Sequence, residues 1–391
     1  MCFQRVEGDS VKESNRMKMQ SSNELNSLNR RSFMRGGLVA GGAAVMGVGV
    51  LGNSKQALAQ DYNNGRGLSR GDVSILRFLA AAELIESDLW TQYAELGGLT
   101  PGQKPVEDTP NFTPMNTYQG ALINLDGDGP QYITSNTLDE VSHADFLNAY
   151  LESKGAEPVN LDQFRTLQGS KATGAKNIGR LTNLMHLNVD TSWFTRYRST
   201  TNPDEGATFP QAVTINNRSA IPVTNADFNN PNHIQVIANI AAFHFGSIEA
   251  GGSSLYASLS QKVSSAEVLE ITLGIGGDEI AHFLEWVDFA GNGCQAPVAP
   301  VTDEGLTFPN LFANPGTPEF QPNLIFPVPA EFISPNLPLC ATIRPLTDKF
   351  AGPRAAIASL TGSGLFTGQS NGFLATLQIL ADEAEAASRS F

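Results

Sequence analysis

The chain has 391 residues, of which 41% are hydrophobic and 16% charged, which is enough for one large globular domain or two modest ones. Residues 1–59 hold 8 of its 25 Lys and Arg and 4 of its 39 Asp and Glu, so residues 60–391 carry a formal charge of −18. Such an acidic chain repels nucleic acids and anionic membrane surfaces, so neither is an expected partner, and it attracts cations.

Residues 1–59 have the features of an export signal. The pair Arg30-Arg31 precedes an apolar, glycine-rich run over residues 37–51, and residues 57–59 (Ala-Leu-Ala) supply a small-residue cleavage site. The apolar run is about 15 residues long, which is shorter than a membrane-spanning helix needs. We therefore expect the twin-arginine machinery to export the folded chain and residues 1–59 to be removed as a signal peptide. The mature protein should be periplasmic or extracellular, without a membrane span.

Four segments carry the 3.6-residue apolar periodicity of amphipathic helices. They cover about residues 72–96, 137–153, 232–259 and 265–290. Ser135 or Asn136 is placed to cap the start of the second segment. Only a few residues separate the third segment from the fourth, so we expect these two helices to be antiparallel neighbours.

The segments outside these helices are rich in Pro, Gly and Asn. A long crossover, residues 156–230, joins the second helix to the third; it has a weaker helical pattern near residues 177–189 and then sequence suited to hairpins. We expect residues 60–291 to form the helical domain. The Pro-rich C-terminal extension, residues 292–391, should end in an amphipathic fifth helix over Gly372–Ser388 that docks on the domain.

Two Glu-x-x-His pairs are the strongest chemical signal in the chain. Glu140 and His143 lie in the second predicted helix, and Glu279 and His282 lie in the fourth. Residues three apart share a face of a helix, so each pair directs a carboxylate and an imidazole the same way. The chain has only five histidines, and two of them are in these pairs. A mixture of oxygen and nitrogen ligands suits iron or manganese and, less well, zinc.

Each pair follows a helix that carries glutamate on its apolar stripe. Glu249 in the third helix is followed seven residues later by Tyr256. In the first helix Glu83 and Glu86 share a face, and Glu86 has Tyr93 at the same spacing. The internal repeat therefore favours Glu86 as a ligand and leaves Glu83 as the alternative. These stripes hold almost no Lys or Arg, which favours a bound metal over the alternative that the ionisable residues form buried salt bridges or lie outward.

The repeated order of a glutamate helix and a Glu-x-x-His helix resembles the ferritin-like superfamily. Within it the chain is most similar to exported ferritin-like domain proteins, which include plant desiccation-related proteins. The resemblance covers about residues 70–155 and 230–290. It depends on the segments Ile75–Leu79, Glu83–Glu86, Glu140–Leu147, Glu249–Tyr256 and Asp278–His282. One departure is Trp90, which stands seven residues after Glu83 where the family pattern has a tyrosine.

The resemblance implies a fold and a site. The fold is all-α, a ferritin-like antiparallel four-helix bundle with a long crossover, loop-rich insertions and a C-terminal extension. The site is a carboxylate-bridged centre of two iron or manganese ions, in which Glu140 and Glu279 bridge and the two histidines are terminal ligands. The full candidate set of ligands is Glu83, Glu86, Glu140, His143, Glu249, Glu279 and His282.

Two functions follow from the resemblance. The first is a dimetal protein that oxidises Fe(II) or reacts with peroxide or oxygen, as ferroxidase-like and manganese-catalase-like proteins do. The alternative is a non-catalytic envelope protein that protects against stress or desiccation. A homo-oligomer is compatible with either function, and metal ions are the expected partners in the first.

The remaining polar candidates match no ligand spacing. We expect His186, His233 and His244 to be structural, because no partner residues converge on them in the sequence. Asp139 and Asp278 directly precede the two ligand glutamates, and we expect them to face solvent or cap neighbouring groups.

Overall fold

Four long helices make up most of the ordered core: α3 (Arg70–Gly97), α4 (Gly129–Ser153), α6 (Pro231–Ser260) and α7 (Ala266–Gly293). The structure is a computed structural model and describes residues 67–105, 107–194, 209–293, 299–311, 329, 331–342 and 352–389. The predicted export signal, residues 1–59, lies outside these ranges. Within them, no helix combines the length and the apolar character that crossing a membrane requires.

Three of these helices begin within two residues of the predicted positions, and each has a side-chain cap at its first turn. Ser69 accepts a hydrogen bond from the backbone N–H of Asp72 at 3.0 Å, which satisfies an open donor at the start of α3. Asn230 caps α6 in the same way, with Pro231 following it. At the start of α7 the hydroxyl of Ser265 accepts from the N–H of Glu267 at 3.2 Å.

Helix α4 begins at Gly129, well before the predicted start, so the capping roles assigned to Ser135 and Asn136 were wrong. Pro130 stands in its first turn, where a fixed φ and a missing N–H suit the helix. Asn136 points into the core, where its amide donates to Oε1 of Glu140 at 2.9 Å. The indole of Trp286 donates to the Asn136 carbonyl oxygen at 2.7 Å. Asn136 is therefore a polar residue on the core face of α4. It interrupts the apolar periodicity, which is why the predicted helix began too late.

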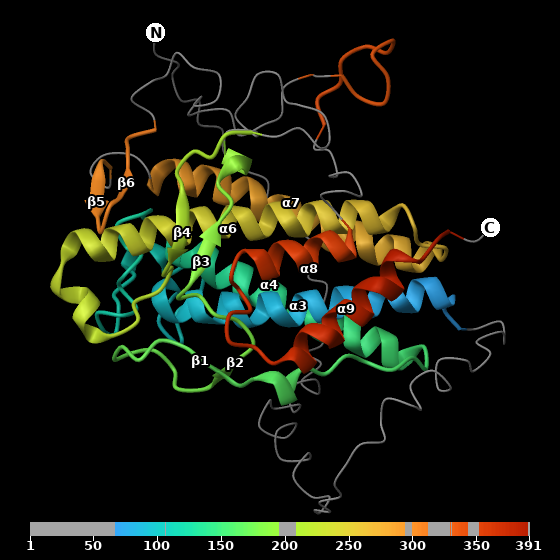
Figure 1. Ribbon diagram of the computed structural model, residues 1–391, viewed down its shortest axis with the longest axis horizontal. Coiled ribbons are helices and arrows are strands. Elements are labelled where there is room, and N and C mark those ends of the chain that lie inside the picture. The colour runs from blue at the N-terminus through green and yellow to red at the C-terminus, as the bar shows by residue number, and fades with distance from the viewer. Residues whose placement is uncertain are drawn as a thin grey trace, which may run out of the picture. The chain divides into compact units, whose positions relative to one another are not determined.

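The long helices pack as two pairs, α3 with α4 and α6 with α7, around one shared core (Figure 1). Only residues 261–265 link α6 to α7, so these two are antiparallel. Aromatic rings fill the space where the pairs meet. Trp90, Phe245 and Trp286 are fully buried, with ring centroids 4.9 to 5.2 Å apart. The prediction of a mainly helical fold is thereby confirmed.

The crossover between α4 and α6 does not contain the helix predicted near residues 177–189. Leu181, Leu184 and Leu187 are buried at a three-residue spacing, which imitates a helical stripe in extended chain. Short antiparallel pairs form instead, in keeping with the expected hairpins. The crossover contains η2 (Asp162–Phe164), β1 (Leu167–Gln168), β2 (Gly179–Arg180), β3 (Leu187–Val189), β4 (Ile215–Arg218) and η3 (Asn225–Asn229), and η1 (Thr109–Asn111) precedes α4.

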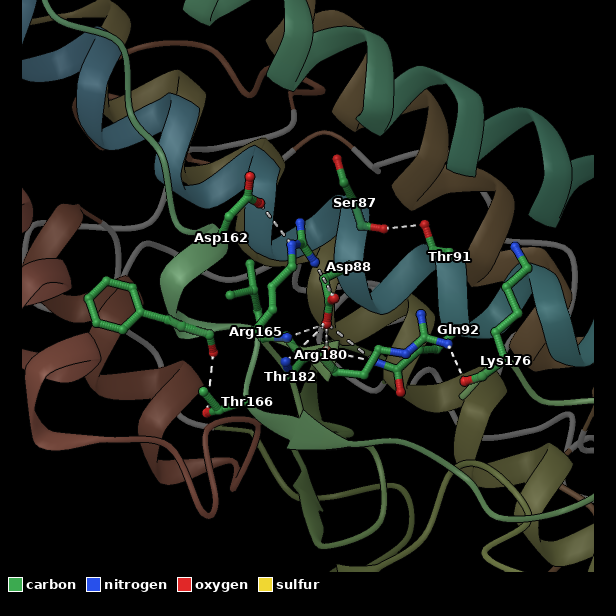
Figure 2. A network of polar contacts seen from close by, with 12 residues as sticks. Ser87, Asp88, Thr91, Gln92, Asp162, Arg165, Thr166, Lys176, Arg180 and Thr182 are labelled. Carbon is green, nitrogen blue, oxygen red and sulfur yellow. Dashed lines mark hydrogen bonds and ion pairs between the residues drawn. The ribbon is translucent and has the colours of Figure 1, made fainter. Parts of the chain in front are cut away.

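Two carboxylates of α3, Asp88 and Glu95, hold the crossover in place, and Figure 2 shows the contacts of Asp88. Asp88 accepts hydrogen bonds from the N–H and the hydroxyl of Thr182 at 2.9 and 2.7 Å, and it pairs with Arg165 at 2.7 Å. Two turns further along, Glu95 accepts from one guanidinium nitrogen of the buried Arg180 at 2.7 and 2.8 Å. A buried carboxylate that receives several donors is well compensated, so these contacts fix the path of an irregular segment.

The described helices of the C-terminal extension pack on the helical core (Figure 1). Helix α9 (Asn371–Glu385) matches the predicted fifth helix, and its Leu377 and Ala381 are fully buried. Helix α8 (Pro353–Gly362) and the hairpin of β5 (Val301–Asp303) and β6 (Leu306–Phe308) were not predicted.

Replacing Asp88 should cost far more stability than replacing Asp162, although both pair with Arg165. Asp88→Asn leaves buried donors without an anionic acceptor and should lower the free energy of unfolding by about 2–4 kcal/mol. Asp162 is 75% exposed, so Asp162→Asn should change it by less than about 0.5 kcal/mol. Urea denaturation of both variants measures the difference, and equal effects would show that Asp88 does not anchor the crossover.

Candidate metal centre

Six ionisable side chains from α3, α4, α6 and α7 converge in the core. They are Glu83, Glu140, His143, Glu249, Glu279 and His282. None is more than 7% exposed. They form two overlapping groups of four, and within each group one ligand atom per residue lies within 4.8 Å of the others. Glu140 and Glu279 belong to both groups, which is the position that a bridging carboxylate occupies between two cations.

The histidines direct the same ring nitrogen into the cluster. Nδ1 of His143 lies 3.4 Å from Oε2 of Glu83 and 3.5 Å from Oε2 of Glu140. Nδ1 of His282 lies 3.1 Å from Oε1 of Glu140 and 3.4 Å from Oε2 of Glu249. The first group thus takes its histidine from α4 and the second from α7. Each group offers one imidazole nitrogen and three carboxylates, a ligand set that suits iron or manganese.

The outer nitrogen of each histidine contacts an aspartate from the other helix of the α4 and α7 pair. Nε2 of His143 lies 3.2 Å from Asp278, and Nε2 of His282 lies 3.4 Å from Asp139. An acceptor there places the proton on Nε2 and leaves the Nδ1 lone pair free for a metal. The expectation that these aspartates face solvent or cap neighbours missed this role. The repeated order Asp-Glu-x-x-His, at 139–143 and 278–282, was the signal for it.

Helices α3 and α6 exchange hydrogen bonds to each other's ligands. Trp90, seven residues after Glu83, donates from its indole nitrogen to Oε1 of Glu249 at 2.9 Å. Tyr256, seven residues after Glu249, donates from its hydroxyl to Glu83. The two glutamates therefore stand in equivalent places, each oriented by an aromatic donor of the other helix. The indole of Trp90 therefore serves as a hydrogen-bond donor to Glu249, as the hydroxyl of Tyr256 does to Glu83.

The structure brings Glu83 into the cluster and leaves Glu86 outside both groups, the reverse of what the internal repeat favoured. Tyr93, the tyrosine on which that preference depended, bonds to His244 rather than to a glutamate. Glu86 keeps some exposure but remains close to the cluster. Loss of hydration and the charges of Glu140 and Glu83 raise its pKa well above the usual range.

Most inward-facing atoms of the cluster lack a hydrogen-bond partner among the described residues. They are Oε2 of Glu83, Glu140 and Glu249, both carboxylate oxygens of Glu279, and Nδ1 of His143 and His282. Polar atoms buried without partners are costly, and bound cations would satisfy all of them at once. The donor set and its orphaned atoms therefore fit a pair of metal ions.

Charge in the cluster is divided between the histidines and the glutamates. Burial raises the pKa of Glu83 to about 8, and it also raises the pKa of Glu249 and Glu279. Burial opposes ionisation of Glu140 too, but the two histidines beside it outweigh burial and hold the Glu140 pKa at about 2. The neighbouring carboxylates of Asp278, Glu140 and Glu83 likewise overcome burial at His143 and raise its pKa to about 12. Metal binding must therefore displace protons from the cluster.

Because Gly252 has no side chain, it leaves space for the carboxylate of Glu279. It lies one turn after Glu249 on α6, and a Cβ atom there would overlap the Glu279 carboxylate. The neighbouring Gly251 has no heavy atom within 4 Å of such a Cβ. The glycines of α7 do not break that helix, and Gly276 allows close packing, since its Cβ would lie 2.8 Å from Cβ of Tyr256.

The three other histidines belong to neither ligand group, but the expectation that no partner residues converge on them does not hold for His233, which lies with Asp303 and Glu304 in a separate, partly exposed group. His186 contacts Asn217 at 3.2 Å. His233 bonds to Asp303 at 2.6 Å and joins the start of α6 to β5. His244 is buried against Tyr93.

No protein-family model, curated protein or solved structure matches this chain. The function must therefore be argued from the site: two groups of buried oxygen and nitrogen ligands, each able to hold a metal ion and joined by two shared carboxylates.

Adding one methyl group at Gly252 should disrupt the site without harming the helix. Gly252→Ala forces the Glu279 carboxylate to move, so we expect at least about a tenfold loss of metal affinity, as for a misplaced supporting group. Gly251→Ala meets no neighbour and should keep the affinity while stabilising α6 by up to about 1 kcal/mol. Metal titration followed by elemental analysis compares the two, and equal affinities would mean that the position of Glu279 does not matter.

Proposed function

We propose that this chain is an exported ferritin-like protein whose four-helix bundle binds a carboxylate-bridged pair of iron or manganese ions. The observation that carries the proposal is the sharing of Glu140 and Glu279 between two groups of four buried ligands. Among the described residues, the ion pairs of the four glutamates in these groups are with His143 and His282 and not with Lys or Arg, so salt bridges compensate the carboxylates only in part. Export by the twin-arginine route and a periplasmic or extracellular location are part of the proposal, predicted from residues 1–59.

The order of the helices supports a ferritin-like bundle. A glutamate helix and a Glu-x-x-His helix occur as a pair, are followed by a long crossover, and then occur again as α6 and α7. All four helices contribute ligands to one core site, as in dimetal-carboxylate bundles. The crossed hydrogen bonds of Trp90 and Tyr256 give the two halves equivalent geometry.

The ligands have distinct roles in this proposal. Glu140 and Glu279 would bridge the metals, Glu83 and His143 would complete one site, and Glu249 and His282 the other. Glu86 would lie beside the centre without ligating it. Bound iron or manganese supplies one-electron redox chemistry towards oxygen or peroxide. The chain's own residues orient the ligands and exclude bulk water, since each ligand is almost fully buried.

Elemental analysis of the purified full-length protein tests the proposal. We expect about two equivalents of iron or manganese per chain, because four carboxylates and two imidazoles make two sites. The double variant His143→Ala/His282→Ala should lose most of the metal, and the matched variant His186→Ala/His233→Ala should keep it. Fewer than about one equivalent, with no loss in the first variant, would contradict the proposal.

The aspartates behind the ligand histidines should tune affinity without belonging to the ligand set. Asp278→Asn replaces the anionic acceptor that holds the His143 tautomer with a neutral amide, and we expect roughly a 10–100-fold loss of metal affinity. Asp145→Asn alters an exposed aspartate of the same α4 surface and should have no effect. Competition with a chelator measures both affinities, and an unchanged value for Asp278→Asn would assign that aspartate to the solvated surface.

Turnover separates the catalytic function from the protective alternative. A redox-active centre should oxidise Fe(II) or consume peroxide in a stopped-flow assay, and the double histidine variant should lose that activity. Two bound metals with negligible turnover would instead support the non-catalytic, stress-protective protein.

A further inference from the structure

A tyrosine and a histidine form an isolated polar pair in the apolar core between α3 and α6. Tyr93 is 0% exposed and His244 is 2% exposed, and the hydroxyl of Tyr93 lies 2.6 Å from Nδ1 of His244. Burial lowers the pKa of His244 to about 3 and raises that of Tyr93 well above its usual range. Both side chains are therefore neutral at physiological pH, and the phenol holds its proton beside a free imidazole lone pair.

The direction of this hydrogen bond follows from the partners available. The Tyr93 hydroxyl has no second hydrogen-bond partner among the described residues, and Nε2 of His244 has none either. Either tautomer of His244 leaves one buried hydrogen without an acceptor, but a phenol O–H is a stronger donor than an imidazole N–H, and an imidazole nitrogen is a better acceptor than a phenol oxygen. Tyr93 therefore donates to Nδ1, and His244 carries its own proton on Nε2.

Packing does not require this pair. In the internal repeat that relates Glu83 to Glu249, the position of His244 corresponds to Phe78 and that of Tyr93 to Leu259. Both counterparts are buried apolar side chains. The other half of the bundle thus fills the equivalent positions with hydrocarbon, so the phenol and imidazole supply chemistry that a well-packed core does not need.

Aromatic rings connect Tyr93 to the candidate metal centre. The rings of Tyr93 and Trp90 meet edge to face with centroids 5.7 Å apart, and the Trp90 indole donates to Oε1 of Glu249 at 2.9 Å. Trp90 also stacks on Trp286 at 5.2 Å. Electron transfer weakens steeply with distance, so rings in contact are favourable relays. Phe245 packs on Tyr93 and on both tryptophans, which keeps the relay dry.

We propose that Tyr93 and His244 form a proton-coupled redox pair that donates one electron, through Trp90, to the metal centre. The oxidant is a metal ion of that centre after its oxidation by oxygen or peroxide, so this step depends on the proposed function. The oxidised metal ion gains one electron and Tyr93 loses one. The Tyr93 O–H bond breaks as an N–H bond forms at Nδ1 of His244, which gives a neutral tyrosyl radical and an imidazolium ion.

The role of the pair is to hold one oxidising equivalent away from the metal ligands. An oxidised phenol is a strong acid, so an acceptor 2.6 Å away lets the proton leave with the electron and return when the electron returns. Tyr93 is buried, so the radical is protected from reaction with solvent. The relay then serves as a reservoir for an electron rather than as a route to the surface.

Rapid freeze-quench electron paramagnetic resonance tests the relay in iron- or manganese-loaded full-length protein mixed with peroxide. We expect a tyrosyl radical in the wild type and at least a tenfold lower yield in Tyr93→Phe, which removes only the hydroxyl. Tyr150→Phe alters another buried tyrosine, on α4, and should leave the signal unchanged. In His244→Phe the proton acceptor is lost, so the radical yield should again fall at least tenfold. Metal content and circular dichroism verify that each variant folds.

A second measurement separates failure of the relay from failure of the proposed function. The metal-free protein is oxidised by a photogenerated ruthenium oxidant, and the tyrosyl signal of wild type is compared with that of Tyr93→Phe. A Tyr93 signal here, but none in the metal-loaded protein, would support the redox pair and overturn its link to the metal centre. Equal signals from wild type and Tyr93→Phe in both measurements would overturn the relay, even if the protein binds two metals and turns over.

Discussion

The structure depends on how four buried carboxylates are compensated where, among the described residues, their ion pairs are with two histidines. Glu83, Glu140, Glu249 and Glu279 are all almost fully buried, and a carboxylate in such a place must be paired, protonated or bound to a cation. Two imidazoles and a few neutral hydrogen-bond donors compensate part of this buried charge. The atoms left without partners all point inward, so the remaining compensation has to come from the centre of the cluster.

Compensation also links the two halves of the bundle. Trp90 of α3 orients a glutamate of α6, and Tyr256 of α6 orients a glutamate of α3. The aspartates of α4 and α7 likewise each contact the histidine of the other helix. Neither pair of helices can complete a ligand group alone, because every group draws residues from both. The site therefore forms only when the two helix pairs pack together.

Periodicity predicted the starts of α3, α6 and α7 to within two residues, although each of these helices also buries polar side chains on its core face. It failed at the start of α4, because Asn136 is a buried polar residue that serves Glu140 and Trp286 rather than a cap. The ligand types and their helices were also readable, since Glu-x-x-His spacing is local. The sequence did not distinguish Glu83 from Glu86 as a ligand. Glu83 is oriented by Tyr256, a hydrogen-bond donor that lies on another helix.

The repeat is imperfect, and its departures make the two shared carboxylates unequal. Glu140 accepts from Asn136, which the indole of Trp286 holds in turn. The position equivalent to Asn136 on α7 is Ile275, which offers no donor, and both oxygens of Glu279 lack hydrogen-bond partners among the described residues. The pKa of Glu140 is accordingly held low while burial raises that of Glu279. Glu140 is thus held by hydrogen bonds, whereas Glu279 has a 3.9 Å ion pair with Nδ1 of His143 and the space that Gly252 leaves. Of the two shared carboxylates, Glu279 is therefore the one that is freer to shift when the charge in the cluster changes.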